Sequence, residues 1–292
     1  MSPRRVIAAI AVALLLAWAV VPLARGLLLV RGGAATPFSA ALTVPHEEVT
    51  FAASDGVRIA GTYLPADGAR ATVVLVHGFK NTRADMLEHA LFLHAAGYAV
   101  LLYDSRGCGQ SGGTFGVGAA EDRDITGAVD FLKAAARLGS THVAVLGVSL
   151  GAGDALLATA RDPRIEAVVA DSSWADERVQ LERMATLPLG PLALPLLPYE
   201  PALVDALVGA RLEDARPRDE VARIAPRPLL LIHSADDQNA TTPLADAQAL
   251  LAAAGEPKEL WIAPRGGHAG AFGAVRDEYT RRVIAFLRGA FR

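Results

Sequence analysis

The feature that most constrains this chain is a Gly-x-Ser-x-Gly motif, Gly147-Val148-Ser149-Leu150-Gly151, which joins a strand-like segment to a helix-like one. Residues 143–148 are apolar and predict a short buried strand, and residues 150–160 predict a helix. In that arrangement the serine lies on a strained turn with its hydroxyl above the edge of a sheet, and the flanking glycines leave room for the backbone. The motif therefore predicts a nucleophile, Ser149, on an α/β scaffold.

Strand-like and helix-like segments alternate through most of the chain. Apolar stretches that predict strands occupy residues 72–76, 98–103, 143–148, 165–170, 228–232 and 259–262. Helical patterns occupy residues 86–96, 121–137 and 274–288. Ahead of them, residues 47–52 and 57–64 predict a hairpin that turns at Ser54-Asp55-Gly56. Apolar strands that alternate with helices indicate a mostly parallel central sheet with helices on both faces, and so an α/β fold.

Four groups of candidate residues follow four of these strands. They are His77-Gly78-Phe79, Ser149, the pair Asp236 and Asp237, and His268. In open parallel sheets, ligands bind beyond the carboxyl ends of the strands, because those ends meet at one edge. We therefore expect all four groups to lie at one site.

The residue types at this edge are those that acyl transfer needs. A serine hydroxyl is a weak nucleophile until an imidazole takes its proton, and a carboxylate holds that imidazole in the right tautomer. The candidate nucleophile, base and acid are Ser149, His268 and either Asp237 or Asp236. The backbone N–H groups of Leu150 and Phe79 are the candidate oxyanion donors.

These motifs resemble those of the α/β-hydrolase family over nearly everything from residue 47 to the end. The segments that carry the resemblance are His77-Gly78-Phe79, Asp104-Ser105-Arg106-Gly107-Cys108-Gly109-Gln110-Ser111, Gly147-Val148-Ser149-Leu150-Gly151, residues 232–237 and Gly267-His268. Within the family, the chain is most similar to membrane-anchored bacterial serine hydrolases of the esterase, acyl hydrolase or serine aminopeptidase-like type. The resemblance implies an α/β-hydrolase fold and hydrolysis through a Ser-His-Asp triad and an acyl-enzyme.

The resemblance also bears on which aspartate is the acid. In the family pattern, this strand is followed by Gly-x-x-Asp, usually with a proline a few residues later. Ser234-Ala235-Asp236-Asp237, with Pro243 beyond it, fits if Ser234 takes the place of the glycine. That frame selects Asp237. Because serine in place of glycine departs from the pattern, Asp236 stays the alternative.

The N-terminal segment predicts a membrane anchor. No charged residue occurs from Val6 to Ala24, and that run is long enough to cross a bilayer as a helix. Arg4 and Arg5 precede it. A cleaved signal peptide is the alternative, because Ala17-Trp18-Ala19 has a small-x-small pattern. We expect an uncleaved, single-pass N-terminal transmembrane helix, with the catalytic domain outside the cytoplasm.

The domain organisation follows from these segments. We expect an anchor at residues 1–31, a linker at residues 32–46 and the hydrolase domain at residues 47–292, with a lid insertion at about residues 172–218. Within the insertion, residues 187–198 carry no charge and four prolines, which exclude a regular helix. Such a strip suits an acyl-binding roof or a contact with lipid, and a lid that packs its apolar side on the domain is the alternative.

Composition narrows the function further. A formal net charge of −3 and a pI near 6.2 offer no basic face for nucleic acid. Cys108 is the only cysteine, and no phosphate loop or ligand cluster indicates a cofactor or a metal. We therefore expect a serine hydrolase that cleaves a small-molecule carboxylic ester or thioester. A peptidase or acyltransferase with the same triad is one alternative, and a catalytically silent membrane-tethered binding protein is another.

Overall fold

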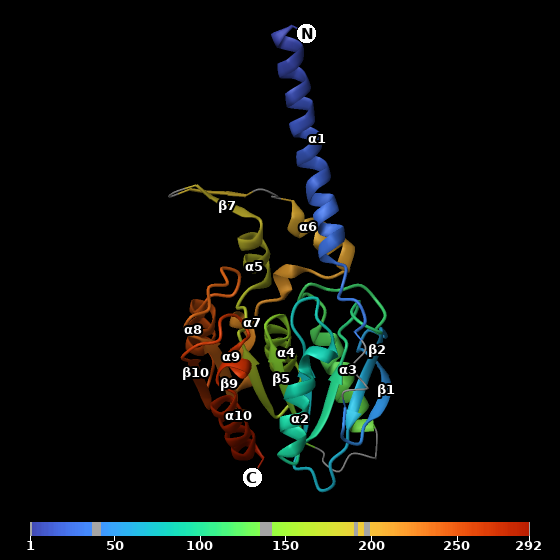
Figure 1. Cartoon of the computed structure of the whole chain (residues 1–292), viewed down its shortest axis with the longest axis vertical. Coiled ribbons are helices and arrows are strands. Elements are labelled where there is room, and N and C mark those ends of the chain that lie inside the picture. The colour runs from blue at the N-terminus through green and yellow to red at the C-terminus, as the bar shows by residue number, and fades with distance from the viewer. Residues whose placement is uncertain (1, 37–41, 135–141, 190–191, 196–198, 292) are drawn as a thin grey trace.

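The computed structural model describes residues 2–36, 42–134, 142–189, 192–195 and 199–291, without the side chains of residues 14, 17, 19, 186–189 and 192–195. Its centre is an eight-stranded sheet in the order β1-β2-β4-β3-β5-β6-β9-β10 (Figure 1). The strands are β1 Glu47–Ala52, β2 Arg58–Leu64, β3 Thr72–Val76, β4 Ala99–Tyr103, β5 Val143–Val148, β6 Ala167–Asp171, β9 Leu229–Ser234 and β10 Lys258–Ala263. The first two strands form the predicted hairpin and β2 is antiparallel to β4, whereas all pairs from β4 to β10 are parallel.

Helices cover both faces of the sheet. The helices are α2 Leu87–Ala95, α3 Asp122–Ala134, α4 Leu150–Arg161, α8 Leu244–Ala253, α9 Ala271–Ala274 and α10 Arg276–Ala290. Because successive residues of a strand point to opposite faces, Val74 and Val76 join a core cluster with α3, α4 and α8, whereas Val73 and Leu75 join another with α2 and α10. All four side chains are fully buried, which explains why these strands read as continuous apolar runs.

The segment between β6 and β9, where the sequence predicts a lid, contains several short elements. They are α5 Glu177–Met184, β7 Thr186–Leu189, β8 Leu192–Pro195, α6 Glu200–Val208 and α7 Pro217–Glu220. β7 and β8 pair antiparallel, and the hairpin projects from the domain to the left, away from α1, in Figure 1. The predicted roles of the strip at residues 187–198 depend on side chains that lie outside the described residues, so those roles stay predictions.

The N-terminal helix α1, Pro3–Leu29, extends away from the domain (Figure 1). Within the described part of the chain, no helix combines the length and the hydropathy that crossing a membrane requires. The transmembrane helix predicted from Val6 to Ala24 is therefore not confirmed. The helix that covers those residues continues to Leu29 and includes the charged Arg25, which pairs with a carboxylate of α6.

The C-terminal half of α1 packs on α6. The guanidinium of Arg25 lies 2.7 Å from the fully buried carboxylate of Glu200. A Cβ atom on Gly26 would lie 2.8 Å from the side chain of Leu203, so the glycine permits close approach of the two helices. Trp18 of α1 packs edge-on against Tyr199 with a centroid distance of 5.0 Å. This contact fixes α1 to the β6–β9 segment.

The chain between α1 and β1, where the sequence predicts a linker, lies partly on the domain. Ala34 forms an isolated parallel bridge with Gly109, and the N–H of Gly109 donates to the carbonyl of Gly33 at 2.8 Å. Residues 37–41 of the predicted linker lie outside the described residues. The proposed domain limits of residues 1–31, 32–46 and 47–292 stay predictions.

Candidate active site

The Gly-x-Ser-x-Gly motif forms a tight turn between β5 and α4. Ser149 has φ 55° and ψ −116°, a conformation that few residues other than glycine adopt. A Cβ atom on Gly147 would lie 2.1 Å from the carbonyl oxygen of Gly151, and one on Gly151 would lie 2.5 Å from that of His77. Both glycines are therefore needed to let the turn close, and the turn lifts Ser149 to the carboxyl edge of the sheet.

His268 contacts both other members of the predicted triad. It lies in the loop between β10 and α9, and its Nε2 is 2.8 Å from Ser149 Oγ. Its Nδ1 is 3.0 Å from Oδ2 of Asp237, which follows β9. If Nδ1 carries the proton, it donates to Asp237, and Nε2 is free to accept from the serine hydroxyl. The structure thus brings together the three side chains in the order that proton transfer requires.

The two adjacent aspartates have different surroundings. The side chain of Asp237 is fully buried, and its Oδ1 accepts from the N–H of Asn239 at 2.8 Å. Asp236 is exposed, and its Oδ1 accepts from the N–H of Gly267 at 2.8 Å. Asp236 therefore holds the loop that carries His268, whereas Asp237 contacts the imidazole itself.

Two further side chains around His268 were not singled out by the sequence analysis. The hydroxyl of Thr242 lies 3.1 Å from Nδ1 of His268. His233, at the end of β9, is fully buried with Nε2 3.2 Å from Asp237 Oδ2 but without a hydrogen bond to it. Burial lowers the pKa of His233, so the imidazole stays neutral beside the aspartate. The position of His233 at the carboxyl end of a strand is the signal that could have identified it.

The loop after β6 supports the histidine loop from the other side. Ser172 Oγ donates to Oδ1 of Asp171 at 3.0 Å and accepts from the N–H of Ala269 at 3.1 Å. Burial raises the pKa of Asp171 to about 6. These bonds tie the residue after His268 to the end of β6.

The predicted oxyanion donors lie beside the serine. A Cβ atom on Gly78 would lie 3.3 Å from Cβ of Ser149, so the backbone of the loop after β3 passes next to the nucleophile. Leu150 is the first residue of α4, where backbone N–H groups have no partner within the helix. Among the described residues, no hydrogen bond uses the N–H of Phe79 or of Leu150. Both groups can therefore serve a substrate.

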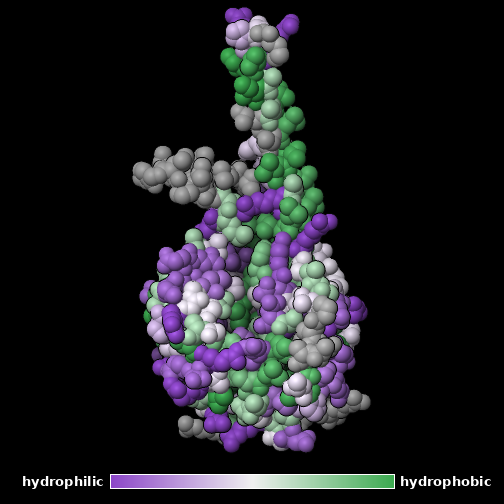
Figure 2. Space-filling model, in the orientation of Figure 1, coloured by the Kyte–Doolittle hydropathy of each residue, from purple (hydrophilic) through white to green (hydrophobic). Residues whose placement is uncertain are grey.

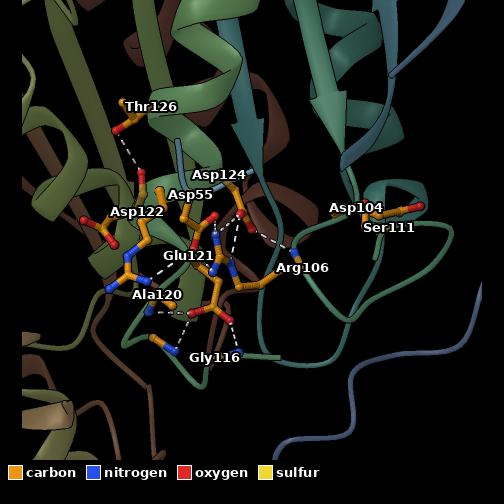
Figure 3. A network of polar contacts seen from close by, with 12 residues as sticks. Asp55, Asp104, Arg106, Ser111, Gly116, Ala120, Glu121, Asp122, Asp124 and Thr126 are labelled. Carbon is orange, nitrogen blue, oxygen red and sulfur yellow. Dashed lines mark hydrogen bonds and ion pairs between the residues drawn. The ribbon is translucent and has the colours of Figure 1, made fainter. Parts of the chain in front are cut away.

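A network around Arg106 shapes the loop that follows β4 (Figure 3). Its guanidinium donates to Asp124 and to Asp55, with distances of 2.8 to 2.9 Å, and lowers the pKa of Asp55 to about 2. In the same network, the carboxylate of Glu121 accepts from the N–H groups of Gly116, Gly118 and Ala120. This network holds in place the turn at Val117, which reaches the active-site pocket.

The triad opens into a cavity of about 470 Å³. Its lining includes Phe79, Asn81, Val117, Val148, Glu177, Gln180, Met184, Asn239 and Thr241, beside Ser149 and His268. Among the described residues, no group of three or more histidines, cysteines or carboxylates could hold a metal ion. The cavity therefore combines a nucleophile with apolar walls and a few polar side chains.

Comparison with known proteins finds similarity to hydrolases. A model of the serine aminopeptidase S33 family matches residues 67–199. The uncharacterized protein YfhR of Escherichia coli K12 is 29% identical over 252 residues, which cover 84% of this chain and 81% of that protein. A thiohydrolase of Arthrinium phaeospermum, apmlB, is 35% identical over 129 residues, 42% of each chain. The Pyrococcus furiosus esterase Pf2001 superposes with a TM-score of 0.73 at 23% identity, over 90% of this chain and 99% of the esterase. The last similarity confirms the predicted fold.

Proposed function

We propose that this chain, which belongs to the α/β-hydrolase family, is a serine hydrolase that cleaves a carboxylic ester or thioester through an acyl-enzyme. The observation that carries the proposal is the unbroken line of contacts from Ser149 Oγ through His268 to Asp237, at the mouth of a cavity. A binding protein without catalytic function would have no need of this arrangement on a strained turn.

In the proposed reaction, Ser149, His268 and Asp237 act in both acylation and deacylation. Ser149 Oγ attacks the carbonyl carbon while its proton moves to Nε2 of His268, and Asp237 stabilises the imidazolium. The N–H groups of Phe79 and Leu150 donate to the oxyanion. His268 then gives the proton to the departing alcohol or thiol, which leaves Ser149 acylated. A water molecule, deprotonated by His268, attacks the acyl-enzyme, and the acid and the free serine are released.

The relatives support acyl–oxygen and acyl–sulfur bonds as the bonds cleaved. One solved structure with this fold is named as an esterase, and one partial relative is named as a thiohydrolase. A peptidase is the second candidate, because the family model that matches residues 67–199 is that of a serine aminopeptidase. Amino-acid arylamides assayed beside short esters and thioesters distinguish the two candidates.

Replacement of the nucleophile tests the proposal. Ser149→Ala should abolish hydrolysis of short esters and labelling by a fluorophosphonate, because the hydroxyl next to Nε2 of His268 is lost. Ser54→Ala, at an exposed turn, is the matched control and should retain both. Circular dichroism should show both variants folded. Labelling that persists in Ser149→Ala would contradict the proposal.

We also propose that α1 attaches the protein to a membrane. Large apolar side chains of α1 are exposed, with Ile7, Leu15 and Leu16 at least 60% accessible. Figure 2 shows this helix as a mostly hydrophobic extension above a domain whose face in this view carries many hydrophilic residues. Apolar surface of this extent favours burial in lipid.

A further inference from the structure

Glu177 occupies one wall of the active-site cavity without a function in the proposed reaction. It is the first residue of α5 and only 2% exposed, and its Oε2 has no hydrogen-bond partner among the described residues. An unpaired buried polar atom costs about 1–3 kcal/mol. Such a cost, at a wall of the catalytic cavity, indicates that a ligand supplies the missing partner.

Backbone hydrogen bonds at the start of α5 and a neighbouring loop position Glu177. Asp176 caps α5 by accepting from the N–H of Val179 at 3.1 Å, and the N–H of Glu177 donates to the carbonyl of Ala215 at 3.0 Å. A Cβ atom on Gly118 would lie 3.0 Å from both the carboxyl carbon and Oε2 of Glu177, so the loop braced by Glu121 closes against this side of the carboxyl. The cavity lies on another side.

Gln180 is a second polar residue in the same wall of the cavity. It lies three positions along α5, on the same face of the helix as Glu177, and it also lines the cavity. Gln180 is 9% exposed, and its Oε1 has no partner among the residues that the structure describes. Phe79, Val117 and Met184 make other parts of the wall apolar. The cavity is therefore apolar with one polar corner.

The chemistry of this corner selects a neutral partner. Burial raises the pKa of Glu177 well above its ordinary value, and the nearby carboxylates of Glu121 and Asp176 raise it further. Burial therefore favours the protonated carboxyl, which donates a hydrogen bond. Oε1 of Gln180 can only accept. A hydroxyl, which accepts one hydrogen bond and donates another, satisfies both groups at once.

We propose that Glu177 is a specificity-determining residue that, with Gln180, binds a hydroxyl group on the acyl or the alcohol portion of the substrate. The proposal rests on the serine hydrolase function and names the substrate class of that site: hydroxylated esters or thioesters. A plain alkyl chain would leave both polar groups unpaired, so the enzyme should discriminate against it.

Matched ester pairs test this specificity. One pair is ethyl hexanoate and ethyl 3-hydroxyhexanoate, and the other is butyl acetate and 4-hydroxybutyl acetate. The native enzyme should favour the hydroxylated member of one pair by about tenfold in kcat/KM, which corresponds to about 1.4 kcal/mol. Glu177→Gln keeps a donor and should retain the preference within about threefold, whereas Glu177→Leu should reduce the ratio to about one. Because each ratio is internal to a variant, partial loss of folded protein does not change it.

Three outcomes would overturn the proposal. They are a native enzyme without preference in either pair, a Glu177→Leu variant that keeps the preference, and a preference for 4-aminobutyl acetate that Glu177→Gln abolishes. The last would show an ionised carboxylate that binds a cation. Binding of 3-hydroxyhexanamide and hexanamide to Ser149→Ala, with and without Glu177→Leu, measures the same discrimination without turnover. The two proposals can therefore fail separately.

Discussion

The carboxylate of Asp237 lies 3.0 Å from Nδ1 of His268, whereas that of its neighbour Asp236 turns away to the backbone N–H of Gly267 at 2.8 Å. Two adjacent aspartates thus have different roles: Asp237 contacts the imidazole, and Asp236 holds the loop that carries it. Asp237 is shielded from solvent and Asp236 is not, so the charge of Asp237 acts on His268 with less screening.

The first prediction compares these two aspartates. Asp237→Asn should lower kcat for a short ester by about 10³-fold or more, because an amide in this place favours the wrong imidazole tautomer. Asp236→Asn should lower kcat by less than about tenfold, since only one bond to the loop weakens. Steady-state kinetics at fixed pH measure both. If the two variants rank in the opposite order, Asp236 is the acid.

The second prediction concerns the packing under the nucleophile turn. A Cβ atom on Gly153 would lie 2.0 Å from the Trp174 ring, whose Nε1 donates to the carbonyl of Leu150 at 2.9 Å. Gly153→Ala should therefore lower the free energy of unfolding by about 1–3 kcal/mol and slow fluorophosphonate labelling of Ser149. Gly289→Ala, in α10 with no atom within 4 Å of the added Cβ, should change neither or stabilise slightly. Equal effects of the two substitutions would show that Trp174 does not pack as described.

Much of the sheet and of the triad could be predicted, because the signals are local. An apolar run such as residues 143–148 has the pattern of a buried parallel strand whatever surrounds it, and the glycines around Ser149 define the turn by themselves. Alignment of Ser234-Ala235-Asp236-Asp237 with the Gly-x-x-Asp pattern favoured Asp237, the aspartate that lies next to His268 in the structure.

Other features depend on contacts between distant segments and left no local signal. The unpaired carboxyl of Glu177 becomes visible only when α5 is placed on the cavity of Ser149. In the sequence, Arg25 only interrupts an apolar run. In the structure, it forms an ion pair with Glu200 of α6. The sequence pattern shows that Glu177 lies near the start of a predicted helix and that Arg25 ends a predicted membrane span. It does not show which residues these side chains contact in the fold.

The third prediction is a pH dependence of stability. His89 of α2 stacks on Phe272 at a centroid distance of 4.2 Å, and neither ring nitrogen has a hydrogen-bond partner among the described residues. Burial lowers its pKa from 6.5 to about 4. His89 of the unfolded chain is therefore protonated below pH 6.5, whereas His89 of the folded protein is protonated only below about pH 4. The contribution of neutral His89 to the free energy of unfolding is fully present above pH 6.5. It decreases as the pH is lowered, by about 2 kcal/mol at pH 5.

Urea unfolding of native protein and His89→Leu at pH 7.5 and pH 5 measures this contribution. The loss of stability between the two pH values should be smaller in His89→Leu by about 2 kcal/mol, because other titrating groups contribute equally to both proteins. The same loss in native protein and in His89→Leu would show that His89 is protonated while folded.

The last prediction concerns α1, and the contact with α6 determines where the chain should be cut. Removal of residues 2–22 deletes most of the exposed apolar side chains but keeps Arg25 on the buried carboxylate of Glu200, whose isolation would cost about 3–5 kcal/mol. Full-length protein should float with liposomes and resist alkaline carbonate, because apolar burial holds it there. The shortened protein should stay in solution and hydrolyse a short soluble ester with unchanged kcat/KM. Flotation of both forms would place the lipid contact outside α1, and a native N-terminus between residues 20 and 35 would instead indicate a cleaved signal peptide.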